Sequence, residues 1–167
     1  MENVVRTYKL LISNNIPEDL FVLQYGQELF NHLKKEAFII DKGRCAGCEH
    51  EPPGHKKNDL FFHIYEVNKI NPELSKGITL CKACHATQHI ENSIKNNWII
   101  FVNSTYDQNN LIRLNRANQT YGLINQKFIV PLKKTPEQFL KEWYSGEAKL
   151  TTTLKVIFTN NFNFDDL

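Results

Sequence analysis

Apolar side chains recur at helical spacing near the start of the chain. Leu20, Leu23, Phe30 and Leu33 follow an acidic, proline-led start, which predicts a helix from about 17 to 36. Phe38-Ile39-Ile40 is short and apolar, and we expect a strand there. Residues 60–67 are rich in aromatic and branched side chains, which is typical of a strand.

Strand-like and helix-like segments alternate along the remaining pattern. Turns are expected at Asn71-Pro72 and Lys76-Gly77. Thr135-Pro136-Glu137-Gln138 matches a capping box with proline at the first helical position. Further expected elements are an extended piece at 78–80, a helix from Cys81 to about Asn97, a strand at 98–102, a helix at 108–124, a strand at 128–132, a helix from the capping box to about Ser145 and a strand at 150–158.

This order of elements predicts an α+β fold. We expect an N-terminal helical segment at 1–44, a central module at 45–97 and a mixed α/β extension at 98–167, packed as one compact unit. Aromatic residues near the end, such as Phe158 and Phe162, are expected to serve packing, and the last residues from Asn160 are expected to fray.

Composition narrows the class of protein. The chain is 41% hydrophobic and 23% charged, which is ordinary for a soluble protein. Its apolar run at 98–102 is too short to span a bilayer. Its first residues lack the charged start and apolar stretch of a signal peptide. We therefore expect a cytoplasmic protein with no membrane partner, in which cysteines stay reduced and serve as metal ligands rather than disulfides.

The four cysteines fall in two closely spaced pairs. Cys45 and Cys48 form one Cys-x-x-Cys pair, and Cys81 and Cys84 form another, with 32 residues between the pairs. Two intervening residues let a tight turn aim both sulfurs at one ion, and two such turns complete a tetrahedron. A redox dithiol would explain only one pair, and unrelated thiols rarely fall at this spacing. The pattern predicts a structural zinc with all four positions filled.

Three histidines lie close to these pairs in the sequence. His63 lies on the expected strand, His85 follows Cys84 directly, and His89 comes four residues later. Residues four apart lie on one face of a helix, so His85 and His89 are able to bind a second ion together. That ion would be separate from the zinc because Cys84 and His85 point about 100° apart around a helix.

Taken together, residues 45–90 resemble the HNH endonuclease family with zinc knuckles. The resemblance rests on the two cysteine pairs, His63-Ile64 on a strand, Asn71 to Leu74, Gly77 to His85, and His89. It implies a ββα-metal finger of treble-clef type. It also implies that His63 is the general base and that His85 and His89 bind a catalytic Mg²⁺, Mn²⁺, Ni²⁺ or Zn²⁺.

Two positions depart from the family pattern. The family usually has His or Asp directly before the strand base as a metal ligand, and this chain has Phe62. The middle Asn of the family falls at Lys76, or has shifted to a neighbour such as Asn71. Lys cannot accept the hydrogen bonds of an Asn. Two protein ligands then remain unless His55, Asp59 or Glu66 supplies a third, and two ligands with waters and phosphate oxygens would hold an ion only weakly.

The charge pattern is compatible with a DNA partner. The formal net charge is +2, and four thiolates with one Zn²⁺ bring it to about zero. Residues 91–134 carry six basic against two acidic side chains, although composition alone favours a solvated surface for them. Candidate contacts to a nucleic-acid backbone are Lys56, Lys57, Arg113, Arg116, Lys133 and Lys134.

Three functions fit these observations. The first is a metal-dependent endonuclease or nickase acting on DNA, for which a homodimer is compatible because many enzymes of the family pair two sites. The second is a catalytically inactive finger that binds DNA or another protein, as Phe62 and Lys76 would suggest. The third is a structural zinc scaffold whose work is done by residues 98–167, where no motif was found.

Overall fold

The computed structural model describes residues 18–118, 123–124, 127–148 and 151–164, apart from the side chain of Asn58. The described parts form a mixed α+β fold with small sheets, as the sequence predicts. The chain divides into two compact units, Met1–Gln88 and His89–Leu167, which are described separately. The expected three segments within one compact unit remain a prediction.

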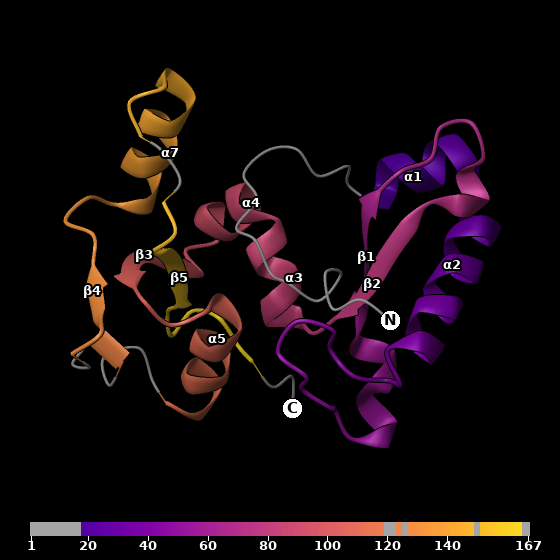
Figure 1. The fold of residues 1–167 in the computed structure, drawn as a ribbon, viewed down its shortest axis with the longest axis horizontal. Coiled ribbons are helices and arrows are strands. Elements are labelled where there is room, and N and C mark those ends of the chain that lie inside the picture. Colours follow the sequence, from indigo (N-terminus) through magenta and orange to yellow (C-terminus); the bar gives the residue numbers. More distant parts are fainter. Residues whose placement is uncertain (1–17, 119–122, 125–126, 149–150, 165–167) are drawn as a thin grey trace. The chain divides into compact units, whose positions relative to one another are not determined.

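The N-terminal helical region consists of two helices rather than one. Helix α1 spans Glu18–Tyr25 and helix α2 spans Gln27–Ile40 (Figure 1). Gly26 separates them and has a φ of 100°, a backbone conformation that residues other than glycine rarely adopt. The prediction of a strand at residues 38–40 is wrong, because these residues form the last turn of α2. Tertiary burial along α2, at Leu33 and Ala37, outweighs a short β-favouring tripeptide.

A two-stranded antiparallel sheet follows these helices. Strand β1 spans Phe61–Glu66, as expected, and pairs with β2 at Lys76–Leu80. The prediction of a turn at Lys76-Gly77 is wrong, because both residues belong to β2. The connection turns instead through a short 3-10 helix, η3 at Pro72–Leu74.

The side chains of β1 alternate between two environments. Phe62 and Ile64 belong to an apolar cluster with Phe21 of α1 and with Leu33 and Ala37 of α2. In Figure 1, α2 lies along the β1–β2 pair. His63 points to the opposite face because successive side chains alternate across a strand. Phe62 is therefore a packing residue on the face away from His63.

The helix expected from Cys81 to Asn97 is interrupted. Helix α3 spans Lys82–Gln88 and helix α4 spans Ile90–Lys95. His89 lies between them with φ −124° and ψ 64°, outside the helical region, and the two helices fall in different units. Within the described part of the chain, no helix has the length and apolar character needed to cross a membrane.

The second unit contains a three-stranded antiparallel sheet in the order β4-β3-β5. Its strands are β3 at Ile99–Ser104, β4 at Ile129–Pro131 and β5 at Leu154–Phe158, close to the three expected strands. Helix α5 spans Gln108–Ala117, and part of its expected continuation lies outside the described residues. Val102, Leu111, Leu123, Ile129 and Ile157 form the core of this unit.

Two buried amide side chains of α5 form hydrogen bonds with backbone groups at the outer edge of β5. The Gln108 side chain accepts a hydrogen bond from the Val156 backbone N–H at 2.8 Å and donates to its carbonyl at 2.7 Å. Asn115 Nδ2 donates to the Phe158 carbonyl. These bonds replace those that a further strand would make, so α5 protects this edge from pairing.

The end of the second unit is packed by aromatic rings. Helix α7 spans Pro136–Ser145, and the Thr135 side chain accepts a hydrogen bond from Gln138 N, as the capping motif predicts. Phe162 is buried against Trp98 and Phe158, which confirms the packing role expected for these rings. The fraying expected from residue 160 is therefore wrong at Phe162, and residues 165–167 lie outside the described part.

Gly77→Ala is expected to lower the free energy of unfolding by about 1–3 kcal/mol, because overpacking strains a closed core. A Cβ at Gly77 would lie 2.3 Å from Phe62 Cε1 and 2.8 Å from the His63 carbonyl oxygen. Gly54→Ala is the matched control, since a Cβ there meets nothing within 4 Å. Urea denaturation followed by circular dichroism measures both. Equal stability of the two variants would contradict this packing.

Candidate metal centres

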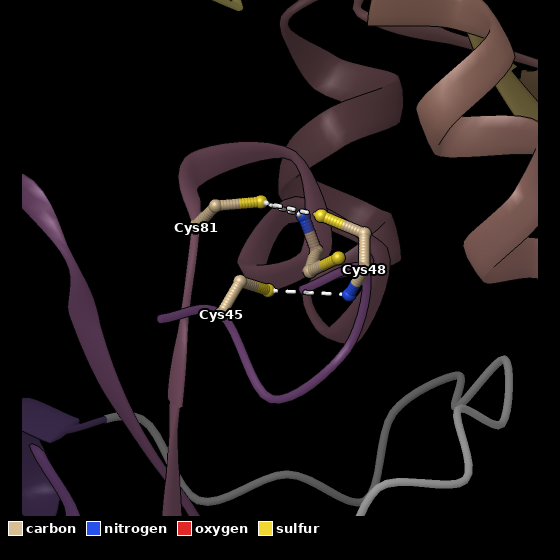
Figure 2. A group of neighbouring side chains, drawn as sticks. Cys45, Cys48 and Cys81 are labelled. Atoms are coloured by element: carbon tan, nitrogen blue, oxygen red, sulfur yellow. Dashed lines mark hydrogen bonds between the residues drawn. The ribbon is translucent and has the colours of Figure 1, made fainter. Parts of the chain in front are cut away.

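All four cysteines are buried, and their sulfurs lie within 4.8 Å of one another. Those of Cys45, Cys48 and Cys81 point toward one another in Figure 2. The Cys48 and Cys81 sulfurs are 3.7 Å apart. Two sulfurs about 2.3 Å from one ion at a tetrahedral angle lie about 3.8 Å apart. The four cysteines therefore fit a metal ion such as zinc.

Backbone N–H groups point at the first sulfur of each pair. Gly47 N and Cys48 N donate to Cys45 Sγ at 3.3 and 3.4 Å, and Cys84 N donates to Cys81 Sγ at 3.4 Å. Each Cys-x-x-Cys turn thus presents donors to a sulfur that would carry negative charge. Such bonds favour the thiolate, which is the form that binds metal.

The four thiols differ in how readily they ionise. Burial raises the pKa of the Cys45 and Cys84 thiols well above the usual value. Hydrogen bonds from neighbouring thiols, that of Cys45 first, lower the pKa of Cys48 and of Cys81. Metal binding requires all four sulfurs to be deprotonated, and a divalent cation stabilises that charge in a buried site.

The first cysteine pair is fixed to strand β2 and to the end of α2. Ala46 N donates to the Thr79 carbonyl at 2.7 Å, and Thr79 N donates to Asp41 Oδ2 at 2.9 Å. Asp41 follows α2 directly and is buried. These bonds set the loop of the first pair beside the second pair, whose Cys81 follows the last residue of β2.

A second group of side chains lies close together. Glu18, His63, His85 and His89 offer ligand atoms that all lie within 4.8 Å of one another. Glu18 Oε1 is 3.0 Å from His85 Nε2 and 3.8 Å from His63 Nδ1. The His63 side chain is 1% exposed, against 17% for His85 and 26% for Glu18. The sequence pattern singled out the three histidines but not Glu18.

His63 and His85 of this group are held by two different elements. His63 is buried on β1, and His85 lies in the first turns of α3, where its N–H donates to the Cys81 carbonyl at 2.8 Å. The Phe61 ring stacks on the His85 ring, with centroids 4.6 Å apart and planes 10° apart. The cysteine cluster at the start of α3 therefore also sets the position of His85.

His89 reaches this group by a different route from the one the sequence suggests. His85 and His89 were expected on one face of a continuous helix, but α3 ends at Gln88. His89 follows it directly, so its ligand atom is placed by the chain turning out of the helix.

The alternative third ligands lie elsewhere. His55, Asp59 and Glu66 are exposed and belong to neither group of candidate ligands among the described residues. Glu66 Oε2 lies 3.5 Å from Lys76 Nζ, so Lys76 forms an ion pair on the surface.

Asn68, rather than Asn71, organises the loop between β1 and β2. Its side-chain oxygen accepts hydrogen bonds from the Ile70 and Asn71 N–H groups, and its own N–H donates to Ser75 Oγ at 2.9 Å. An Asn side chain that can accept from the backbone two residues on, here four residues before Pro72, is a turn signal that could have identified this role from sequence.

Most of the expected basic contacts already have partners. Lys57 pairs with Glu51 at 3.2 Å, and Lys134 pairs with Glu142. Arg113 donates to Asn110 Oδ1 at 2.7 Å, and Arg116 lies over the Phe164 ring. Lys133 is exposed and Lys56 is half-buried. The last four of the expected contacts, at 113, 116, 133 and 134, belong to the second unit.

A pocket with a basic lining is formed by residues of α2, β1 and β2 together with Lys57. Its volume is about 370 Å³, and Phe61, whose ring stacks on His85, lies in its wall. Lys34 and Lys35 of α2 line it together with Lys57. The sequence pattern missed Lys34 and Lys35, because α2 is basic on this face without a longer charge run.

Cys84→Ser is expected to lose the bound metal and to unfold the β1–β2 region. The free energy of metal binding at such a site contributes directly to the free energy of folding. Elemental analysis measures the metal, and amide hydrogen exchange measures protection of β1 and β2. Strands β3 and β5 serve as the internal control. A variant that keeps full protection of β1 and β2 without metal would refute a structural metal here.

Comparisons of this chain with protein-family models, with curated proteins and with solved structures find no match. A function for it therefore rests on the chemistry of the two side-chain groups.

Proposed function

We propose that this chain is an HNH-type, metal-dependent endonuclease or nickase that hydrolyses phosphodiester bonds in DNA. In this proposal Cys45, Cys48, Cys81 and Cys84 bind a structural Zn²⁺. The observation that carries it is the meeting of His63 on β1 with His85 on α3, within one group of candidate ligands next to the cysteine cluster.

The order of the elements supports this proposal. Strands β1 and β2 form an antiparallel pair, and the second cysteine pair joins β2 to α3. A ββα-metal finger requires this order, with the base on the first strand and a metal ligand on the helix. The ring centroids of His63 and His85 lie 6.0 Å apart, so the two imidazoles are direct neighbours in one group.

His63 would act as the general base. An imidazole nitrogen can take a proton from a water molecule that attacks phosphorus. A divalent ion held by His85 and His89 would neutralise the charge that develops on the phosphate. The burial of His63 restricts the motion of its ring, and a fixed position favours catalysis by a group that is already oriented.

The basic pocket supplies a binding surface for the DNA backbone. Lys34, Lys35 and Lys57 line it, and Phe61 joins it to the histidine group. Lysine side chains bind phosphate as point charges and give affinity without sequence recognition. Lys34 and Lys35 therefore become the leading backbone contacts, ahead of Lys57, Lys134 and Arg113, which already have partners.

The second candidate is an inactive finger that binds DNA or a protein. The departures at Phe62 and Lys76 favour it, since Phe62 lies in the apolar cluster and Lys76 pairs with Glu66. It predicts metal-dependent folding and binding, but no cleavage with any divalent ion.

His63→Ala is expected to reduce nicking of supercoiled plasmid by about 10²–10⁴-fold, the usual effect of removing a general base. The assay uses zinc-loaded protein with Mg²⁺, Mn²⁺, Ni²⁺ or EDTA. His32→Ala is the matched control because His32 is an exposed histidine on α2. Undiminished cleavage by His63→Ala would remove His63 from this role. No cleavage by the folded wild type would favour the inactive finger.

Replacing both Lys34 and Lys35 with Ala is expected to weaken DNA binding uniformly across sequences. The slope of log K against log salt concentration should fall by about 2, because about one counterion is released for each phosphate contact. Lys141→Ala, at an exposed site on α7, is the control. Fluorescence anisotropy at several salt concentrations measures the slope, and an unchanged slope would rule out this pocket as the phosphate site.

A further inference from the structure

We infer that Glu18 is a metal ligand, so that helix α1 completes the divalent-ion site of His85 and His89 from outside the finger. The use of that ion in cleavage rests on the proposed function, but its binding does not. Neither the sequence pattern nor the family resemblance assigns Glu18 a role.

The distances within the group fit ligands of a common ion. Glu18 Oε1 lies 3.0 Å from His85 Nε2. Carboxylate oxygens and imidazole nitrogens bind at about 2.1 Å, so two such ligands at right angles around an ion lie about 3.0 Å apart. Glu18, His63 and His85 all belong to the first unit, so this geometry lies within a single compact body.

The packing of α1 determines where Glu18 points. Phe21 is fully buried in the apolar cluster with Phe62 and Ile64 of β1. Glu18 lies one helical turn before Phe21, and its carboxylate oxygen lies 3.0 Å from His85 and 3.8 Å from His63. The Glu18 carboxylate is accordingly only 26% exposed, whereas the adjacent Asp19 is exposed to solvent.

Glu18 supplies the metal-ligating side chain that Phe62 does not have. With Phe62 directed into the apolar cluster, the finger itself offers only His85 and His89 beside the proposed base. Adding one carboxylate gives two imidazoles and one negatively charged oxygen, a donor set that suits Mn²⁺, Ni²⁺ or Zn²⁺ and leaves positions for water or a phosphate oxygen. The carboxylate also lowers the net positive charge that a bound divalent ion brings to a partly buried site.

A different role for Glu18 would be a simple pair with His85. In that case the 3.0 Å contact is a hydrogen bond that orients the imidazole, and no ion is needed. The two roles differ in one measurable property, because only a ligand contributes directly to the affinity for a divalent cation.

The test is a Mn²⁺ titration of the zinc-loaded protein, followed by electron paramagnetic resonance in the absence of DNA. Mn²⁺ favours oxygen and nitrogen donors, so the thiolate site does not compete for it. Glu18→Gln is expected to weaken Mn²⁺ binding by about tenfold or more through loss of the charged ligand. Asp19→Asn removes the same charge one residue away and should leave the affinity unchanged.

The outcomes separate this inference from the proposed function. Equal Mn²⁺ affinity in wild type and Glu18→Gln, with unchanged zinc content and circular dichroism in both, overturns Glu18 as a ligand. Glu18-dependent Mn²⁺ binding supports it, even if the wild type cleaves no plasmid and the endonuclease proposal fails. Phe21→Leu, which keeps an apolar anchor in α1, should bind Mn²⁺ more tightly than Glu18→Gln.

Discussion

The convergence of four buried sulfurs is the constraint on which the first unit depends. Cys45 and Cys48 lie in the loop after α2, and Cys81 and Cys84 lie where β2 passes into α3. A single ion bound there would fix the end of α2, the sheet and the start of α3 together. Because His85 follows Cys84 directly, the same constraint places an imidazole against the face of β1 that carries His63.

Strand β1 connects the apolar core with the candidate chemistry. One of its faces packs Phe62 and Ile64 against α1 and α2, and the other holds His63. The departure at Phe62 therefore has a structural use. It is part of the cluster that anchors Phe21, and through Phe21 it positions the helix from which Glu18 reaches His85. In our proposal Glu18 on α1 takes the place of the ligand that the HNH pattern would have at Phe62.

Local sequence patterns predicted most strands and the cysteine cluster, but not the helix boundaries. The spacing of each cysteine pair is set by turn geometry, so it can be interpreted without tertiary information. The break at Gly26 uses a positive φ that glycine allows, the helical state of residues 38–40 follows burial along α2, and the break at His89 occurs at a residue that is neither Gly nor Pro. Helix propensity and the absence of Pro therefore do not predict the structure at residues 38–40 and at His89.

The candidate ion site could be predicted from local sequence only in part. The spacing of His63, His85 and His89 is short enough to form a motif, whereas Glu18 is 67 residues from His85. Nothing in the sequence near Glu18 distinguishes it from an acidic residue that merely begins a helix. Likewise, Lys34 and Lys35 gain significance only through the pocket that α2 forms with Phe61. Such residues are found by tertiary structure alone.

Anomalous X-ray scattering from crystals of the zinc-loaded protein soaked in Mn²⁺ tests the central claim most directly. Our account predicts a zinc peak among Cys45, Cys48, Cys81 and Cys84, and a separate manganese peak within bonding distance of Glu18 and His85. A single zinc peak, with the Glu18 carboxylate hydrogen-bonded to His85 and no manganese beside it at saturating Mn²⁺, would contradict it.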